Sequence, residues 1–208
     1  MSELKIYGTP ASRTFRVLWM AEELGIDYEH VPVEFRTGAC KTPEFRAINP
    51  NGRIPAIRDD KTTLWESLAI NLYLAKRHPG PLSPKTLEDE AQTIQWSMWA
   101  LTEAEPHIVA ILLNRLVLPE DKRDAALVAR AEAALKAPFE VLDGVLAERD
   151  FLVGDSFTVA DLNVCSVVST CLRIDFDLGP YPNVMAWIDR GLARPAARAA
   201  DEMRRAAA

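Results

Sequence analysis

The chain has few cysteines, and they are not arranged for a metal site or a disulfide. Cys40, Cys165 and Cys171 are an odd number, form no CxxC pair and have no histidine at metal-ligand spacing. The pattern argues against a structural disulfide and a zinc site, so we expect no metal. Cys165 and Cys171 fall on a segment predicted to be a buried helix, which indicates core positions, whereas Cys40 lies in a long loop.

The chain also lacks a long block of one charge and an apolar run of membrane-spanning length. Its 208 residues include 24 Lys and Arg against 30 Asp and Glu, a net charge of −6. The absence of a basic arm argues against nucleic acid as a partner. The apolar segments that follow the charged first residues are interrupted by Arg16, Glu22 and Glu23. We therefore expect no membrane partner and predict a soluble, cytoplasmic protein.

Nearly half of the residues, 49 %, are hydrophobic, which is enough to form a substantial core. The first part of the chain alternates short strand-like and helix-like segments and predicts a mixed α/β unit. Strands are expected at 4–7, at 28–34, in "PAIRD" and in "TTLW", and helices at 15–24, closed by Gly25, and at 66–76. The order is βαβ and then ββα, and parallel strands are the default for the βαβ unit.

After the Pro-rich stretch "RHPGPLSPK" at residues 77–85, only helical spacing remains. We expect a first domain over 1–78, a linker over 79–86 and an all-helical domain over 87–208. Its helices are expected at 88–116, 121–146, 158–172 and 182–192, followed by an Ala/Arg-rich tail that can form a final, fraying helix. In "FTVAD", Thr158 and Asp161 have the spacing of a capping box that begins a helix.

Two stretches of the first domain allow both a structural and a functional interpretation. In "RIPAI", Pro55 suits the start of a strand or an edge strand. Alternatively, a cis Ile54–Pro55 peptide turns the Ile54 backbone outward to pair with an extended peptide ligand. In "WESLAI", Glu66 and Ser67 suit ordinary helix capping. Alternatively, the free N–H groups and Ser67 bind a carboxylate while Glu66 binds an ammonium group, as an α-amino acid terminus requires.

The motifs "GRIPAI", "ESLAI" and "FTVAD", in this order and at this spacing, resemble those of the cytosolic glutathione S-transferases, and the similarity runs over nearly the whole chain. The resemblance implies a thioredoxin-like first domain, an all-helical second domain and a homodimer. It also implies glutathione as co-substrate. Glu66 and Ser67 are then expected to hold the γ-glutamyl amino and carboxylate groups, and Ile54 to pair its backbone with the cysteinyl unit.

The resemblance also implies a place for the glycyl carboxylate of glutathione. Lys41 and Arg53 lie near the basic positions of the family and are expected to face this group. A solvated surface lysine explains Lys41 equally well. Cys40, which directly precedes Lys41, could approach the glycyl end, but an incidental loop cysteine is the preferred interpretation.

The stretch "YGTPASRT" contains four hydroxyl side chains, and a transferase of this kind needs one of them to stabilise the glutathione thiolate. A donated hydrogen bond, aided by a helix N-terminus, has the required strength. Ser12 precedes the first helix and matches the position used by serine-type bacterial members, although it also suits a plain N-cap. Tyr7, near the position used by tyrosine-type members, ranks second. Thr9 and Thr14 are expected to be structural.

The electrophile is expected to bind between the two domains, against the helix "QTIQWSMWALTEAEPHIVAILLNRL". Trp99, His107 and Ile111 recur there at helical spacing and are the pocket candidates, whereas core packing is the preferred role of Trp96. Glu103 is a candidate to reach the ligand's ammonium group across the dimer. Pro106 lacks a backbone donor, so a kink is expected beside it.

These observations predict a glutathione transferase that conjugates the thiolate to small hydrophobic electrophiles, in a detoxifying role. One alternative is another glutathione-dependent reaction, such as peroxide reduction, dehalogenation or isomerisation, because fold does not fix chemistry. A second alternative is a non-catalytic module that binds glutathione or another ligand. The joint presence of Ser12, Ile54–Pro55 and Glu66–Ser67 favours the enzyme.

Overall fold

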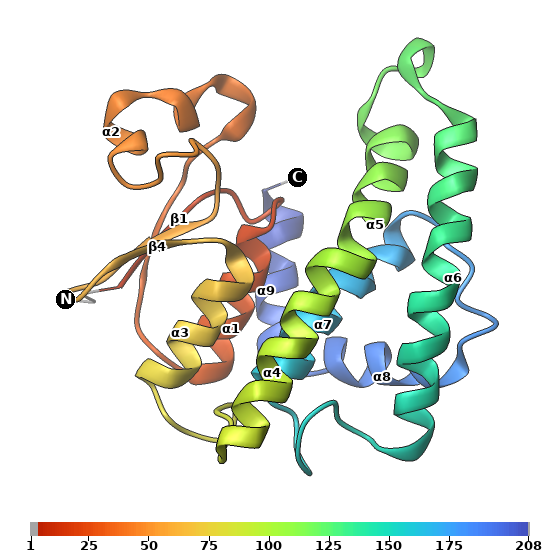
Figure 1. Ribbon diagram of the computed structural model, residues 1–208. Coiled ribbons are helices and arrows are strands. Elements are labelled where there is room, and N and C mark those ends of the chain that lie inside the picture. The colour runs from red at the N-terminus through yellow and green to blue at the C-terminus, as the bar shows by residue number, and fades with distance from the viewer. Residues whose placement is uncertain (1–3, 208) are drawn as a thin grey trace. The chain divides into compact units, whose positions relative to one another are not determined.

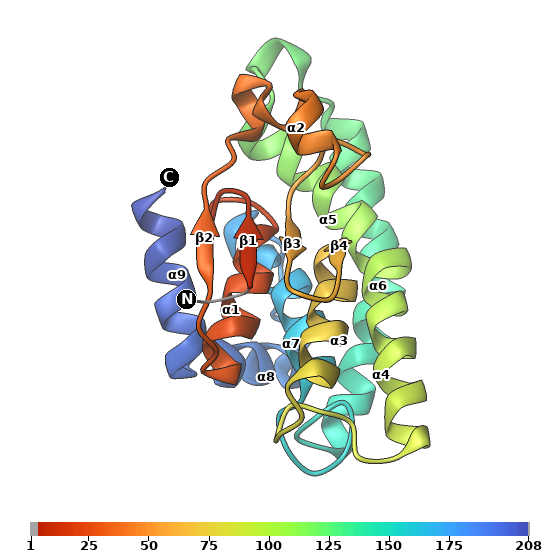
Figure 2. The ribbon, with the colours of Figure 1, turned by 90° about the vertical axis from the view of Figure 1, so that its left-hand side faces the viewer.

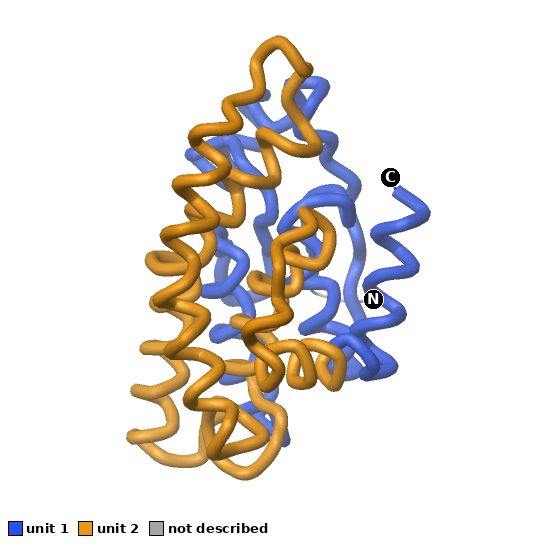
Figure 3. The backbone as a smooth tube through the Cα atoms, turned by 90° about the vertical axis from the view of Figure 1, so that its right-hand side faces the viewer, with its two compact units in different colours: residues 1–83, 192–208 blue, residues 84–191 orange. Residues whose placement is uncertain are grey.

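A computed structural model describes residues 4–207. The chain forms two compact units, shown in different colours in Figure 3. The first unit combines the described residues up to Ser83 with those from Leu192 onward, and the second unit spans Pro84–Gly191. No helix among the described residues has the length and apolar character needed to cross a membrane.

A mixed four-stranded sheet forms the centre of the first unit. Its strands are β1 (Lys5–Tyr7), β2 (Glu29–Val31), β3 (Ala56–Arg58) and β4 (Thr63–Trp65), in the spatial order β2-β1-β3-β4 visible in Figure 2. β1 pairs with β2 in parallel, and the other two pairs are antiparallel. The expected βαβ-ββα order and the parallel first pair are confirmed.

The longer helices of the first unit are α1 (Thr14–Leu24), α3 (Ser67–Arg77) and α9 (Pro195–Ala206), of which α3 and α9 both contact α1. Figure 1 shows them beside the sheet. Fully buried Ile6, Ile57, Trp19 and Leu74 contribute to the core. Gly25 ends α1 in the left-handed conformation, with φ 59°, as its position after the last apolar residue predicts.

The segment between β2 and β3 is not a plain loop. It contains two 3₁₀ turns, Phe35–Thr37 and Ala39–Lys41, and the short helix α2 (Pro43–Arg46). Val33, Cys40, Phe45 and Ala56 form a small apolar cluster beneath this segment, and the Tyr7 side chain packs against it. The cluster holds the segment onto the end of the sheet.

The second unit is helical throughout. Its α-helices are α4 (Leu87–Trp99), α5 (Glu105–Leu112), α6 (Ala125–Glu148), α7 (Val159–Val168) and α8 (Pro182–Leu192). Shorter turns follow α4 at Ala100–Ala104, α5 at Leu113–Val117 and α7 at Ser169–Arg173, and another lies at Glu120–Lys122. Cys165 and Cys171 are buried, as expected for core residues, and burial raises the pKa of both thiols.

The long helix expected over 88–116 is interrupted close to Pro106. The turn Ala100–Ala104 is π-helical, and the Glu105 N–H bonds to the Ala100 carbonyl five residues earlier. Pro106 has no N–H and occupies the first turn of α5, where helices tolerate proline. The irregularity expected beside Pro106 is therefore a wide turn that precedes it.

The capping box that begins α7 is present and buried. The Asp161 carboxylate accepts hydrogen bonds from the N–H groups of Leu152 at 2.9 Å and Thr158 at 3.0 Å, and from Trp187 Nε1 at 3.1 Å. Burial raises the pKa of Asp161, and these donors act against that shift. A second, surface capping box joins Thr86 and Asp89 at the start of α4.

The tail of the chain forms α9, which packs against α1. Ala197 and Ala200 are buried, and the Arg194 guanidinium binds Glu23 through two contacts of 2.6 and 2.8 Å. The Arg204 guanidinium lies 4.7 Å from the centre of the Phe15 ring. Packing thus groups this segment with the first unit. The expected domain limits follow the order of the sequence and assign the same segment to the second domain, 87–208, and they stay a prediction.

Candidate functional site

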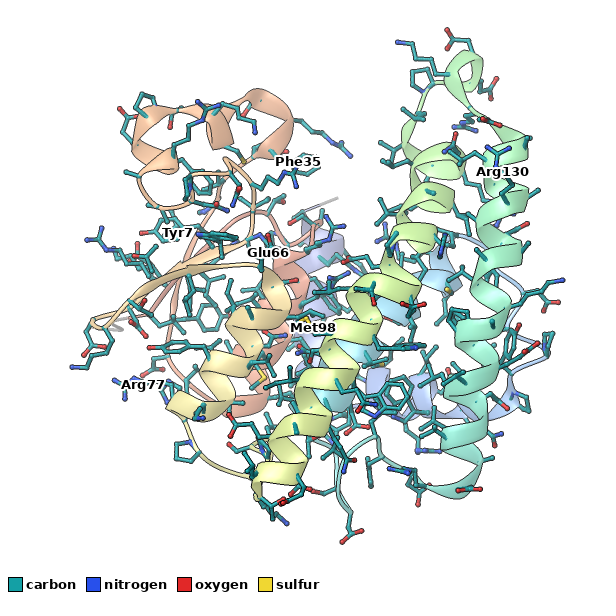
Figure 4. The ribbon with its side chains drawn as sticks, viewed as in Figure 1. Tyr7, Phe35, Glu66, Arg77, Met98 and Arg130 are labelled. Atoms are coloured by element: carbon teal, nitrogen blue, oxygen red, sulfur yellow. The ribbon has the colours of Figure 1, made fainter. Side chains whose placement is uncertain are left out.

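Strand register brings the three sequence motifs of the first unit to one end of the sheet. Tyr7 is paired with Ala56, and Ala56 with Trp65, so these residues form one row across β1, β3 and β4. Gly8, Pro55 and Glu66 directly adjoin this row, each next to the end of one of these strands. Tyr7 and Glu66 are labelled in Figure 4, both at this end of the sheet. The motifs, which are up to 60 residues apart in sequence, therefore converge in space.

Gly8 lies between the first turn of α1 and the peptide before β3. A Cβ atom at this position would lie 2.1 Å from Thr14 Oγ1 and 3.1 Å from Ile54 Cβ. Gly8 also has φ +140°, where residues with side chains are strained. Its carbonyl is 2.7 Å from His30 Nε2 on β2. Only glycine allows this close approach of α1 to Ile54.

The half-buried Ser12 lies in the turn before α1. α1 begins at Thr14, one residue before the expected range of 15–24, and Arg13 rather than Ser12 occupies the N-cap position. Ser12 Oγ nevertheless accepts the Thr14 N–H at 3.1 Å, donates to the Thr9 carbonyl at 2.7 Å, and lies 3.0 Å from Thr14 Oγ1. The Ser12 hydroxyl is thus fixed at the N-terminus of α1, where the helix dipole favours a negative charge.

Tyr7 has clear packing partners. Its ring meets the Phe45 ring edge-on, with 6.4 Å between centroids, within the apolar cluster beneath residues 33–56. The side chain is half-buried. These contacts explain an aromatic residue at this position without any chemistry.

The Ile54–Pro55 peptide is cis. β3 lies between β1 and β4, so Pro55 precedes an interior strand, and the edge-strand interpretation of this proline does not apply. The buried Asn49 side chain donates a 2.6 Å hydrogen bond to the Arg53 carbonyl and so fixes the backbone just before the cis peptide. Sequence reasoning missed Asn49, which stands among turn residues in "INPNG".

Lys41 and Arg53, the candidates for the glycyl carboxylate, both lie on the segment between β2 and β3. Lys41 Nζ donates to the carbonyls of Asn51 at 3.3 Å and Gly52 at 2.8 Å, and the Arg53 side chain is exposed. Cys40 is buried in the apolar cluster, and burial raises its pKa. A buried thiol with a raised pKa is a poor nucleophile, which agrees with the incidental role expected of Cys40.

Glu66 adopts a backbone conformation that residues with a side chain rarely adopt. Its φ is 71° and its ψ 111°, and its side chain is exposed at the N-terminus of α3. Such conformations cost about 1–3 kcal/mol and concentrate at binding sites. Ser67 is buried, and its Oγ accepts a hydrogen bond from Nη1 of the buried Arg16 at 3.4 Å. Arg16, on α1, was not predicted, because its contact with α3 spans 51 residues.

The candidates from the helical unit have different environments. Trp99 and His107 are half-buried, whereas Ile111 is completely buried in the structure. Trp96 is buried and meets Trp99 edge-on at 5.3 Å, as expected for a core residue. Glu103 is exposed and accepts a hydrogen bond from the Thr102 hydroxyl at 3.1 Å. Sequence reasoning did not single out the exposed apolar side chains of Leu113, Leu116 and Val117 just beyond Ile111.

Comparison with known proteins gives matches in both halves of the chain. Residues 2–76 match the family "Glutathione S-transferase, N-terminal domain", and residues 104–195 match "Glutathione S-transferase, C-terminal domain". Glutathione S-transferase 3 of Zea mays is 35 % identical over 205 residues, which cover 94 % of this chain and 92 % of the relative.

Solved structures agree over nearly the full length. The glutathione transferase URE2P5 from Phanerochaete chrysosporium has a TM-score of 0.92 at 26 % identity, with 100 % of this chain and 96 % of that chain covered. It has also been cocrystallised with 1-(S-glutathionyl)-2,4-dinitrobenzene. The theta class enzyme from Xanthomonas axonopodis pv. citri, with glutathione bound, has a TM-score of 0.90 at 29 % identity, with 96 % and 97 % covered. The thioredoxin-like unit followed by a helical one is thereby confirmed, and the chain belongs to the glutathione S-transferase family.

Proposed function

We propose that this transferase uses Ser12 to hold the glutathione thiolate and transfers it to small hydrophobic electrophiles. The observation that carries the proposal is the convergence of Ser12, the cis Ile54–Pro55 peptide and the strained Glu66 at one end of the sheet. The relatives crystallised with glutathione and with its dinitrobenzene conjugate add support.

Each part of glutathione has a complementary group in this arrangement. The exposed Glu66 carboxylate suits the γ-glutamyl ammonium group, and Ser67 at the N-terminus of α3 suits its carboxylate. Ile54 offers its backbone N–H and C=O to the cysteinyl unit, as in strand pairing. The exposed Arg53 suits the glycyl carboxylate, and Lys41 can add a further N–H donor there while bound to the carbonyls of residues 51 and 52.

The chemistry requires a lowered thiol pKa rather than a general base. A thiol with a pKa of about 8.5 is only a few per cent ionised at neutral pH. Lowering this pKa by about two units corresponds to about 3 kcal/mol, which a hydrogen bond from Ser12 and the α1 dipole together can supply. Transfer then forms the bond from sulfur to the electrophilic carbon and releases the leaving group.

The electrophile site is proposed on the helical unit. Trp99 and His107 are half-buried and retain accessible surface, and Leu113, Leu116 and Val117 add exposed apolar surface on the same helical segment. Ile111, being fully buried, supports this wall from behind. Apolar surface with few polar groups suits small hydrophobic electrophiles.

We also propose a homodimer that acts in the cytoplasm, with Glu103 reaching toward the ligand of the partner subunit. The exposed apolar residues of α4 support the dimer. The three cysteines are free and buried, which suits a reducing compartment.

Two variants test the role of Ser12. Ser12→Ala is expected to keep binding to immobilised glutathione but to lose most turnover of chlorodinitrobenzene, because the thiol pKa rises. Tyr7→Phe keeps the ring that packs on Phe45 and is expected to retain turnover. Titration of the bound thiol by its ultraviolet absorbance measures the pKa directly. Normal turnover of Ser12→Ala together with loss in Tyr7→Phe would transfer the role to Tyr7.

A further inference from the structure

The direction of the hydrogen bond between Ser12 and Thr14 follows from donor counting. A serine hydroxyl has one proton and two lone pairs. The Thr9 carbonyl can only accept, so at 2.7 Å it takes the Ser12 proton, and the Thr14 N–H can only donate. The Thr14 hydroxyl, 3.0 Å away, must therefore be the donor to Ser12 Oγ. Thr14 thus supplies both hydrogen bonds that the Ser12 oxygen accepts.

The Thr14 hydroxyl, which donates to Ser12 Oγ, is also shielded from solvent. The residue is completely buried, and Thr14 Oγ1 lies so close to Gly8 that a Cβ atom there would be 2.1 Å from it. Bulk water does not reach this hydroxyl, so water does not compete for its proton. In a site of low dielectric constant, such a hydrogen bond is stronger than one at the surface.

We infer that Thr14 is a positioning residue for Ser12, whose hydroxyl strengthens the hydrogen bond from Ser12 to the glutathione thiolate. A thiolate carries a full charge and is a better acceptor than the Thr9 carbonyl, so the Ser12 proton turns from the carbonyl to the sulfur. The lone pairs of Ser12 Oγ accept the two hydrogen bonds from Thr14, so these bonds do not compete for the Ser12 proton. Linked hydrogen bonds polarise one another, so Thr14 makes Ser12 a stronger donor.

The inference rests on the proposed role of Ser12 and predicts a pH-dependent loss of activity. Thr14→Val keeps the shape of the side chain but removes the hydroxyl. We expect it to raise the pKa of the bound thiol and to lower kcat/KM for chlorodinitrobenzene about threefold below neutral pH, with the difference vanishing in alkaline solution. Thr14→Ser restores the hydroxyl and is expected to restore the thiol pKa. Thr14→Ala provides the same measurement if the valine variant does not fold.

Combining variants separates this inference from the proposed function. Adding Thr14→Val to Ser12→Ala is expected to cause no further rise in the thiol pKa, since Thr14 acts through Ser12. A pKa unchanged by Thr14→Val but raised by Ser12→Ala overturns the inference and leaves the proposed function intact. A further rise in the double variant also overturns it, because Thr14 then acts on its own. A pKa unchanged by Ser12→Ala refutes the proposed function itself.

Discussion

Glu66 is a residue whose backbone and side chain have opposing effects. Its positive φ of 71° is unfavourable for the fold, whereas its exposed carboxylate has no hydrogen-bond or ion-pair partner among residues 4–207 that would account for the strain. In the proposed binding site, this backbone conformation orients the Glu66 carboxylate and the first N–H groups of α3 toward the ligand, so the strain serves binding. This separation of effects can be measured with two substitutions.

Glu66→Gly is expected to stabilise the protein and weaken its function. Glycine adopts a positive φ without strain but loses more entropy on folding, so the free energy of unfolding rises by about 1 kcal/mol. Losing the proposed contact with the glutathione ammonium group is expected to raise the KM for glutathione by about tenfold or more. Urea denaturation and steady-state kinetics measure the two effects.

The matched control for this substitution is Glu66→Ala. Alanine removes the same carboxylate but retains a Cβ atom, so the KM is expected to rise equally while the stability does not increase. Equal stability of the two variants would show that the backbone at Glu66 is not strained. An unchanged KM in both would remove Glu66 from the ammonium site.

Local signals at the residue scale were readable from the sequence, and long-range ones were not. Gly25 and the Thr158–Asp161 pair could be predicted because the groups that each contacts lie within a few residues. The closeness of Gly8 to both Thr14 and Ile54 could not, because it depends on how β1, α1 and β3 meet. From the sequence, Thr14 is an ordinary residue of the first helical turn. Only the structure shows that its hydroxyl lies within hydrogen-bond distance of Ser12 Oγ.

At the scale of elements, the same capping motif occurs once in the core and once on the surface. Asp161→Ala is expected to cost about 4 kcal/mol, because the N–H groups of Leu152, Thr158 and Trp187 lose their acceptor in a buried site. Asp89→Ala removes the corresponding acid of α4, where water can replace it, and is expected to cost about 1 kcal/mol. Urea denaturation of both variants gives the comparison. Equal losses would mean that burial does not determine the strength of this cap.

The helices differ in how far the sequence determined them. α1, α3, α6 and α8 lie close to their expected ranges because their apolar spacing and capping residues are local. α9 seemed a fraying tail because its sequence is mostly alanine and charged residues. It is held by Arg194 against Glu23 and by Arg204 over Phe15, contacts that span more than 170 residues. Short-range spacing contains no information about such partners.

At the scale of the whole molecule, α4 exposes an apolar face. Leu87, Ile94 and Met98 are 76 %, 45 % and 48 % exposed, and their spacing places them on one side of the helix. Figure 4 labels Met98 on this helix. Trp65, on the edge strand β4 of the other unit, is 39 % exposed. Exposed apolar surface of this kind suits the proposed contact with a second copy of the chain.

The proposed dimer predicts that the native protein elutes in size-exclusion chromatography with light-scattering detection at twice the mass of one chain. Met98→Glu is expected to shift it to a single-chain mass, because the charge would have to be buried unpaired at the contact. Val141→Glu, at a position on α6 that is 54 % exposed, provides the control and is expected to remain dimeric. A Met98→Glu variant that keeps the doubled mass would place the contact elsewhere. A native protein of single-chain mass would refute the dimer.

The Met98→Glu variant also shows whether thiolate formation needs the partner subunit. If this variant has the mass of a single chain and Ser12 still lowers the thiol pKa, thiolate formation is a property of one chain. Only the proposed role of Glu103 then requires the partner.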